Sequence, residues 1–315
     1  MYTMKNKLIL LLSALLMLAL AAPVQAERKL TLMLDWFPNV DHLPVYVAKA
    51  KGYLADENIT LKIISPSETS DALKLAATGK VDIAISYEPQ AIIAAARGLD
   101  FQVVGRLVEH PLTTLLFLKD GPIIKPADLN GKRIGYTVPG LMDIMLKAFA
   151  KLNGIDSYTP INVGFTIVAA LTAGKVDAVM GPFKTYETVT MKHKGLKSEY
   201  FELEKYGIPD YDELIFIAGK KAIAKNKQAI TGFAKAVQRA IDFARKNPET
   251  ALRLYLKQVP EADPKIETDA FALTLPYFAH TQTLENARWQ KFADFAHKHG
   301  LIEKAVYVSM ILPKQ

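Results

Sequence analysis

Strand and helix patterns alternate from residue 28 onward, and this alternation constrains the fold more than any other feature of the chain. Apolar segments typical of strands are separated by segments with helical periodicity. The strands are predicted at 29–34, 60–64, 83–86 and 102–107, and the helices at 42–51, 70–78 and 89–97. Alternation at this spacing is typical of a mostly parallel sheet with helices on its faces. The sequence therefore predicts an α/β fold.

The same pattern restarts after residue 112, which indicates a second lobe. A β-rich run at 113–118 is followed by a tight turn at Asn130-Gly131, a strand and a helix. A second β-rich run, 212–219, is predicted to pair with 113–118, so that these two strands cross between the lobes. This assigns residues 27–115 plus 216–315 to lobe one and residues 116–215 to lobe two. Further helices, predicted to pack on lobe one, lie at 227–246, 248–257, 264–278 and 284–299.

An internal repeat indicates that the two lobes are alike. Gly79-Lys80-Val81-Asp82 and Gly174-Lys175-Val176-Asp177 each follow a helical segment and lead into an apolar strand. The glycines suit the left-handed position that ends a helix. Chance similarity of two βα units is the alternative. Similar lobes would deliver the polar and aromatic loops that follow these strands to one shared site.

The N-terminus has the pattern of a secretory signal peptide. Lys5 and Lys7 precede an apolar stretch at 8–22, and small residues precede a predicted cleavage after Ala26. The apolar stretch is shorter than the roughly 20 residues that span a bilayer. The chain has no cysteine, which excludes disulfides, thiolate metal sites and a lipid-modified cysteine. These features predict export to the periplasm of a two-membrane bacterium, with free secretion as the alternative.

Charge argues against a nucleic-acid-binding protein. Removing residues 1–26 takes away two lysines and lowers the net charge from +7 to +5. The remaining basic residues are spread along the chain and mixed with acids, which is typical of a solvated surface. We therefore expect no nucleic-acid partner.

Three loops at predicted strand ends carry the candidate site residues. In an open α/β sheet, ligands bind at the carboxyl ends of the strands. The loops offer Asp35, Trp36, Asn39 and His42; Ser86, Tyr87, Glu88 and Gln90; and Phe183, Tyr186 and Glu187. An ordinary strand-to-helix connection with a core tryptophan is the alternative for the first loop.

The chemistry of these loops favours a flat, neutral or cationic heterocycle. Aromatic faces can stack on a ring, and carboxylates accept hydrogen bonds from amines. A phosphate or sulfonate site would be expected to show clustered arginine or lysine, or a glycine-rich helix N-terminus. The loops carry several acids and few bases, and the sequence contains neither GxxxxGK[ST] nor GxGxxG.

Enzymatic chemistry finds little support in the sequence. His42 is the only histidine near the proposed site, the other histidines lack metal-ligand context, and no serine lies in a G-x-S-x-G elbow. Glu88 and Glu187 could form a general acid/base pair, although a structural or binding role is the simpler interpretation. We expect no cofactor and no bound metal.

Four segments resemble one known family across nearly all of the chain after residue 26. They are the motif Leu34-Asp35-Trp36-Phe37-Pro38-Asn39-x-x-His42, and segments 47–54, 79–85 and 129–136. The sequence is similar to the family that joins bacterial thiamine-pyrimidine-precursor binding proteins with fungal thiamine-pyrimidine synthases. The resemblance implies a type II periplasmic-binding-protein fold, with two Rossmann-like lobes joined by two crossing strands.

The resemblance also implies a function and site residues. Such a protein captures N-formyl-4-amino-5-aminomethyl-2-methylpyrimidine, or a close relative, and delivers it to an ABC transporter permease for thiamine salvage. Trp36, Asn39 and His42 lie in the quoted motif, whereas Ser86, Tyr87 and Glu187 are placed by position after the repeated strands. We expect a monomer.

Departures from the synthase branch argue against an enzyme. That branch resembles this chain but uses a lysine that binds pyridoxal phosphate, a nearby histidine and a cysteine-rich motif. Ser86 stands at the position of the lysine, Gln90 at that of the histidine, and the chain has no cysteine. The alternatives are a carrier of the same fold for another flat heterocycle such as riboflavin, or for a sulfonate. A membrane sensor in place of a transporter also stays open.

Overall fold

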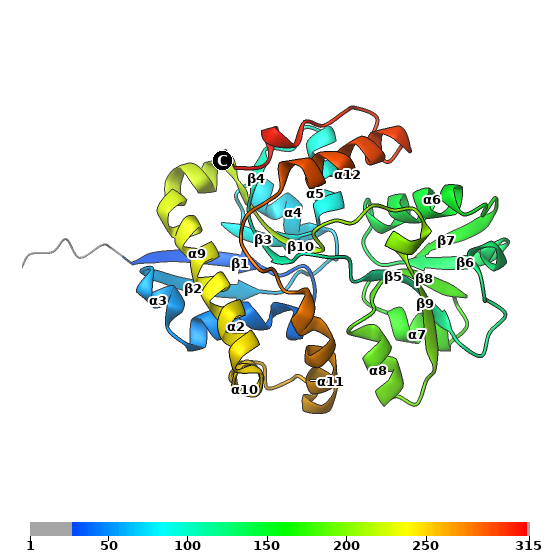
Figure 1. Ribbon diagram of the computed structural model, residues 1–315, viewed down its shortest axis with the longest axis horizontal. Coiled ribbons are helices and arrows are strands. Elements are labelled where there is room, and N and C mark those ends of the chain that lie inside the picture. The colour runs from blue at the N-terminus through cyan, green and yellow to red at the C-terminus, as the bar shows by residue number, and fades with distance from the viewer. Residues whose placement is uncertain (1–26, 314–315) are drawn as a thin grey trace, which may run out of the picture.

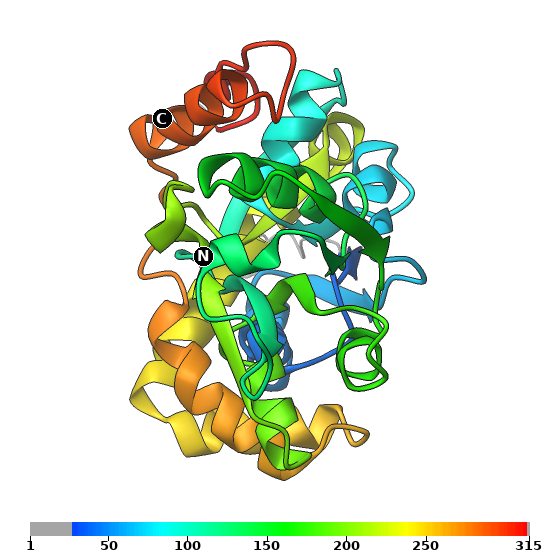
Figure 2. The ribbon, with the colours of Figure 1, turned by 90° about the vertical axis from the view of Figure 1, so that its right-hand side faces the viewer.

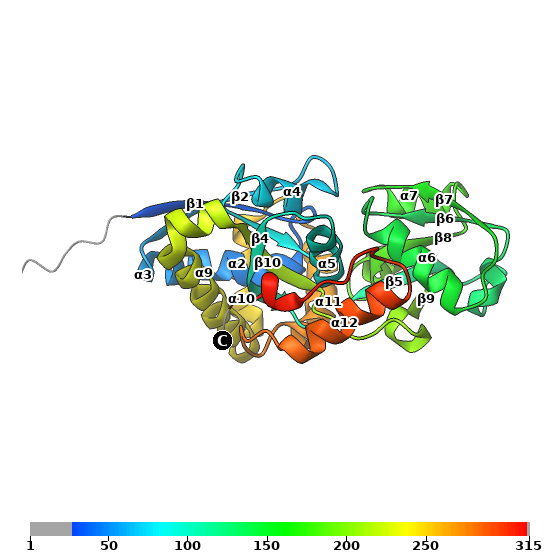
Figure 3. The same cartoon turned by 90° about the horizontal axis from the view of Figure 1, so that it is seen from above.

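Two five-stranded sheets lie at opposite ends of the long axis of the molecule (Figures 1 and 3). The computed structural model describes residues 27–313, so the predicted signal peptide lies outside the described residues. The first sheet has the order β2-β1-β3-β10-β4. Its strands are β1 (Arg28–Met33), β2 (Ile59–Ile64), β3 (Ile83–Ser86), β4 (Phe101–Val108) and β10 (Leu214–Gly219).

The second sheet repeats the plan of the first, with the order β7-β6-β8-β5-β9. Its strands are β5 (Thr113–Leu118), β6 (Lys132–Tyr136), β7 (Tyr158–Asn162), β8 (Ala178–Phe183) and β9 (Ser198–Glu202). In each sheet the first three strands are parallel, and the fourth is antiparallel to both of its neighbours. The α/β prediction is confirmed, and the two halves are alike.

Helices cover both sheets, and most of them belong to the first (Figure 1). With the first sheet we group α2 (Leu43–Ala50), α3 (Tyr53–Asp56), α4 (Asp71–Ala77), α5 (Glu88–Ala96), α9 (Lys220–Lys246), α10 (Pro248–Gln258), α11 (Pro264–Thr274) and α12 (Asn286–Lys298). We call this unit lobe one. Lobe two is the second sheet with α6 (Met142–Leu152), α7 (Ile167–Thr172) and α8 (Glu187–His193). Figure 2, with lobe two toward the viewer, shows the late helices of lobe one above and below it.

Short 3-10 segments complete the chain, and they include the turn that opens the candidate site. They are η1 (Val40–His42), η2 (Pro126–Leu129), η3 (Leu203–Tyr206), η4 (Leu275–Tyr277) and η5 (Val308–Met310). Helix α9 begins seven residues before its predicted start and is kinked at Asn226, where the backbone leaves helical geometry. None of the helices within residues 27–313 is both long and apolar enough to cross a bilayer.

The repeated Gly-Lys-Val-Asp segments have a structural role in both lobes. Gly79 and Gly174 have φ angles of 74° and 61°, the left-handed conformation expected at a helix end. Asp82 accepts a hydrogen bond from the Thr31 amide at 2.9 Å, and Asp177 accepts one from the Arg133 amide at 2.8 Å. Each aspartate therefore fastens the start of a central strand to its parallel neighbour.

The prediction that 113–118 and 212–219 pair as crossing strands is wrong. Strand β5 pairs with β8 and β9 in lobe two, whereas β10 pairs with β3 and β4 in lobe one. The predicted lobe boundaries at 115/116 and 215/216 therefore fall inside strands. The chain crosses between lobes in the irregular segments 109–112 and 207–213. Both runs are β-rich because each is a buried inner strand of its own sheet.

The carboxylate of Glu213 ties the two crossing segments together. It is fully buried, and its Oε2 accepts hydrogen bonds from the Leu112 amide at 2.6 Å and the Thr113 amide at 2.7 Å. Its Oε1 accepts a bond from the Thr113 hydroxyl at 2.8 Å. If the lobes rotate relative to each other, the pivot would therefore lie near Glu213, whose side chain joins the two connecting segments.

We expect Glu213→Gln to lower the free energy of unfolding by about 1–3 kcal/mol, because the amide nitrogen cannot accept from these buried donors. Urea denaturation followed by circular dichroism measures the change. The control is Glu199→Gln, since Glu199 makes only an exposed ion pair with Lys119 and should cost less than about 1 kcal/mol. Equal costs for the two variants would contradict the role given to Glu213.

Candidate functional site

The first wall of the candidate site is a capped turn that follows β1. Asn39 begins η1, and its side-chain oxygen accepts a hydrogen bond from the Asp41 amide at 2.9 Å. In return, His42 Nδ1 accepts one from the Asn39 amide at 3.3 Å. This reciprocal capping fixes both side chains. The sequence folds this way because Pro38 precedes the cap and Pro44 lies in the first turn of α2.

Asp35 is the shared acceptor at the centre of this wall. Its Oδ1 lies 2.9 Å from His42 Nε2, and its Oδ2 accepts a hydrogen bond from the Tyr87 hydroxyl at 2.7 Å. Because His42 Nδ1 already accepts a backbone bond, the ring proton lies on Nε2 and is donated to Asp35. His42 is therefore a neutral donor and offers no positive charge to a ligand.

Lobe two supplies the opposite wall. Glu187 begins α8, and its Oε2 accepts a hydrogen bond from the Phe183 amide at 2.7 Å. Gly181 in β8 has a φ of 123°, and a Cβ atom there would lie 2.0 Å from the hydroxyl oxygen of Thr137. Only glycine allows the two strands to approach this closely.

A narrow cavity lies between the two walls, and it is lined from both lobes. The lining residues are Asp35, Trp36, Asn39, Asp41, His42, Tyr87, Thr137, Ile167, Gly181, Phe183 and Glu187. Its volume is about 20 Å³, close to the space of a single water molecule. A ligand of several atoms therefore requires the lobes to move apart before it can enter.

Trp36 closes one side of the cavity by reaching across to lobe two. Its ring centroid lies 4.5 Å from that of Phe165, at an interplanar angle of 59°. Phe37, which is 51% exposed, contacts the same Phe165 ring at 4.5 Å but does not line the cavity. Trp36 therefore lines the cleft and is not buried in the core of lobe one.

Seven of the eleven candidate site residues line this cavity: Asp35, Trp36, Asn39, His42, Tyr87, Phe183 and Glu187. Ser86, Glu88, Gln90 and Tyr186 do not. Ser86 is fully buried in β3 and donates a hydrogen bond to Gln90 at 2.7 Å. It points away from the cavity because side chains alternate along a strand and its neighbour Tyr87 faces Asp35.

Glu88 lies at the crossing segments. Its Oε2 accepts a hydrogen bond from the Asp212 amide at 2.7 Å. The Asp212 carboxylate in turn accepts bonds from Arg288 at 2.7 Å and the Trp289 indole at 2.8 Å. Burial and the nearby Asp212 charge raise the pKa of Glu88 well above its usual range. Glu88 thus belongs to a buried network that joins α5, α12 and the segment before β10.

Tyr186 links the lobes from outside the cavity. Its hydroxyl donates a hydrogen bond to Glu267 of α11 at 2.8 Å. Two further bonds cross the cleft: the Thr69 hydroxyl donates to the Thr137 carbonyl at 2.7 Å, and His193 Nε2 lies 2.9 Å from Asp269. These contacts hold the lobes in the closed arrangement.

Sequence reasoning missed part of the cavity. It did not select Asp41, Thr137, Ile167 and Gly181. The acid next to His42 was a usable signal for Asp41. The lobe-two residues carry no comparable signal, because a threonine, an isoleucine and a glycine occur in most strand ends and turns.

The cavity is rich in acids, and the described residues that line it include neither lysine nor arginine. Three of them are carboxylic acids. Burial raises the pKa of Asp41 and of Glu187 to about 7. No three histidine, cysteine, aspartate or glutamate side chains within residues 27–313 are placed to hold a metal ion. The arrangement can accept hydrogen bonds from a donor-rich ligand.

These raised pKa values predict how the stability of the ligand-free protein depends on pH. Burial raises the pKa of four carboxyls to about 7, namely those of Asp41, Glu187, Glu213 and Glu267. Unfolded carboxyls titrate near 4. Between pH 4 and 7 the folded state therefore holds more protons than the unfolded state, and stability falls as pH rises through this window.

We expect a lower urea midpoint at pH 8 than at pH 5. Glu187→Gln should flatten the dependence, and a midpoint that rises with pH would contradict the assignment.

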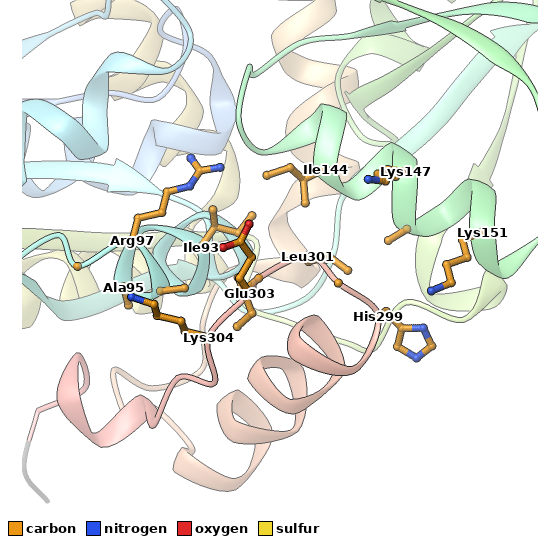
Figure 4. Close-up of a pocket in the computed structure, with 15 residues that line it drawn as sticks. Ile93, Ala95, Arg97, Ile144, Lys147, Lys151, His299, Leu301, Glu303 and Lys304 are labelled. Atoms are coloured by element: carbon orange, nitrogen blue, oxygen red, sulfur yellow. The ribbon is translucent and has the colours of Figure 1, made fainter.

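A larger hollow lies between α5, α6 and the segment after α12 (Figure 4). It has a volume of about 880 Å³, an apolar floor that includes Ile93 and Ile144, and a rim with Arg97, Lys147 and Lys151. These charged side chains are exposed. A small-molecule site usually has a few polar groups buried in the pocket that orient the ligand. The charged side chains of this hollow are exposed instead, so we do not take it as the ligand site.

Comparison with known proteins identifies the relatives of the chain. Residues 39–251 match the family described as NMT1/THI5 like. A Haemophilus influenzae protein, named provisionally for thiamine biosynthesis, is 34% identical, with 92% of this chain and 93% of that protein covered. The formylaminopyrimidine-binding protein of Halalkalibacterium halodurans is 30% identical, with 95% and 96% covered. Proteins named 4-amino-5-hydroxymethyl-2-methylpyrimidine phosphate synthase also match, at 24–29% identity.

Solved structures with the same fold include periplasmic binding proteins. The alkanesulfonate-binding protein of Xanthomonas axonopodis pv. citri, bound to MOPS, superposes with a TM-score of 0.73 at 18% identity. The match covers 92% of this chain and 100% of that chain. The predicted periplasmic-binding-protein fold is confirmed, and at this identity the likeness speaks for the fold alone.

Proposed function

The chain belongs to the NMT1/THI5-like family, and from this premise we propose that it is a periplasmic solute-binding protein of an ABC transporter. We propose as its ligand N-formyl-4-amino-5-aminomethyl-2-methylpyrimidine or a close relative, taken up for thiamine salvage. Export with cleavage after Ala26, and delivery of the ligand to a transporter permease, are parts of the same proposal.

The observation that carries the proposal is an interlobe cavity with three carboxyls, an aromatic wall and, among its described residues, neither lysine nor arginine. An aminopyrimidine is flat and bears N–H donors. Its ring suits the indole of Trp36, and its amines suit buried carboxyls that need donors. The relative named as a formylaminopyrimidine-binding protein supports the same ligand class.

The sulfonate alternative meets an electrostatic obstacle in this cavity. A sulfonate is an anion, and this cavity would bury it beside three acids, two of which have a pKa of about 7, without a lysine or arginine in its described lining to balance the charge. His42 cannot help, because its ring is a neutral donor already engaged with Asp35. Riboflavin is uncharged and stays a chemical alternative, although it is far larger than an aminopyrimidine.

We propose binding and not catalysis as the activity. Ser86 stands at the position of the synthase lysine and is hydrogen-bonded to Gln90, which stands at that of the histidine. A serine side chain has no amine with which to form a Schiff base. The chain also has no cysteine for an iron-linked motif. The pair Glu88 and Glu187 is unsuited to acid–base work on one substrate, because Glu88 lies outside the cavity.

The contacts between the lobes suggest how capture would work. The lobes separate about segments 109–112 and 207–213, a ligand enters against Trp36, and lobe two closes over it. Closure re-forms the bonds from Tyr186 to Glu267 and from Thr69 to Thr137. A transporter permease would then recognise the closed form.

Mass spectrometry of small molecules released from the purified protein tests the proposal. The protein is isolated from periplasmic extract without dialysis, denatured, and the released molecules are compared with those from a Trp36→Ala variant. We expect an amine-bearing pyrimidine that is depleted in the variant. Recovery of a sulfonate or of riboflavin would contradict the ligand assignment, and bound pyridoxal phosphate would favour an enzyme.

A further inference from the structure

Asp41 carries an unpartnered carboxylate oxygen on the wall of the cavity. The residue is 1% exposed, and its Oδ1 accepts a hydrogen bond from the hydroxyl of Thr274 in α11 at 3.0 Å. Its Oδ2 has no hydrogen-bond partner among the described residues. Buried polar atoms without a partner are rare in folded proteins, and each costs about 1–3 kcal/mol. The cavity is the direction from which a partner could come.

None of the described groups around Asp41 is hydrogen-bonded to this oxygen. His42, its neighbour, uses one ring nitrogen for the Asn39 amide and the other for Asp35. The titratable groups near Asp41 also include the carboxyls of Glu187 and Asp35 and the phenols of Tyr186 and Tyr255. Ionised carboxylates accept and do not donate, the Tyr186 hydroxyl donates to Glu267, and Tyr255 makes no hydrogen bond to Asp41. A donor for Oδ2 can come from the cavity that Asp41 lines.

We propose, on the basis of the function proposed above, that Asp41 is a specificity residue whose Oδ2 accepts a hydrogen bond from an N–H group of the ligand. Thr274 is its positioning residue, since its hydroxyl holds the other oxygen while Oδ2 stays unpartnered in a residue that lines the cavity. Asp41 lies at an unspecified position of the family motif quoted above. The ligand class that it selects is a heterocycle with an exocyclic amine, in preference to the same ring with a carbonyl there.

The titration of Asp41 gives the inference a second readout. Burial raises its pKa to about 7, while the hydrogen bond from the Thr274 hydroxyl lowers it. A ligand N–H donor favours the ionised carboxylate, so binding lowers the pKa and releases a proton near pH 7. Affinity should therefore rise between pH 6 and pH 8. Glu187, whose pKa is also about 7, acts in the same direction.

The test compares Asp41→Asn with Glu88→Gln by calorimetric titration with N-formyl-4-amino-5-aminomethyl-2-methylpyrimidine. Glu88 is a matched control because it is fully buried and its Oε1 also lacks a partner, yet it does not line the cavity. We expect Asp41→Asn to weaken binding about tenfold, as a hydrogen bond to a charged acceptor becomes a neutral one. Glu88→Gln, which alters a contact with segment 207–213 but none in the cavity, should weaken binding less than Asp41→Asn does and leave proton release unchanged.

Proton release separates recognition from a merely structural effect. Titrations in buffers with different ionisation heats measure the protons released on binding, and Asp41→Asn should release fewer than the unmodified protein.

Thr274→Val should weaken binding, and Thr274→Ser, which keeps the hydroxyl, should bind like the unmodified protein. If the unmodified protein binds the pyrimidine but Asp41→Asn matches it in affinity and proton release, the role given to Asp41 is wrong while the proposed function stands. If the unmodified protein binds no aminopyrimidine, the proposed function fails and the inference with it.

Discussion

Replacing Asp35 with alanine should lower the free energy of unfolding by about 2–6 kcal/mol, because each buried donor left without an acceptor costs about 1–3 kcal/mol. Two donors lose their partner, the Nε2–H group of His42 and the hydroxyl of Tyr87. Urea denaturation at pH 7 measures the change. Ligand binding should be lost as well, because the capped turn that places Trp36 and Asn39 is built around this carboxylate.

Tyr87→Phe is the matched control for this prediction. It removes one hydrogen bond to Asp35 and leaves the bond from His42, so it should cost about 1.5–3 kcal/mol. Residues in one network do not contribute independently, so the double variant should cost less than the sum of the two single ones. An Asp35→Ala cost no greater than that of Tyr87→Phe would show that His42 does not depend on this carboxylate.

Replacing Trp36 with alanine should weaken ligand binding by about 1–3 kcal/mol, the range found for stacking of a base on an aromatic side chain. This corresponds to a roughly 5- to 150-fold rise in Kd. The indole lines the cavity and also contacts Phe165 of lobe two. The expected loss therefore has two sources: stacking on the ligand and the contact between the lobes.

Phe37→Ala separates these two sources. Phe37 contacts the same Phe165 ring at the same 4.5 Å centroid distance, but it does not line the cavity. If stacking dominates, Phe37→Ala should raise the Kd by less than about fivefold while Trp36→Ala exceeds that value. Equal effects in the two variants would mean that Trp36 acts only by holding the lobes together.

Much of the fold could be predicted from the sequence because its signals are local. Alternating strands and helices, and the glycines that end α4 and α7, depend on residues close in the chain. The pairing of β5 could not be predicted in this way. Its apolar run fits a crossing strand and an inner strand of lobe two equally well, and partners 60 or more residues away decide between them.

The candidate site shows the same division. Trp36, Asn39 and His42 form one short motif whose capping geometry is local, so the sequence could place them together. Ser86 ends β3 and Glu88 begins α5, and only the folded strand-to-helix junction shows that Tyr87 between them faces the cavity. The importance of Asp41 depends on Thr274, which lies 233 residues away in α11. Such pairings exist only once the chain is folded.

Calorimetric titration of the purified protein with N-formyl-4-amino-5-aminomethyl-2-methylpyrimidine, beside an alkanesulfonate, tests the central claim most directly. The acid-rich cavity predicts saturable binding of the pyrimidine with one site per chain and no measurable heat from the sulfonate. Binding of the sulfonate without binding of the pyrimidine would contradict the account.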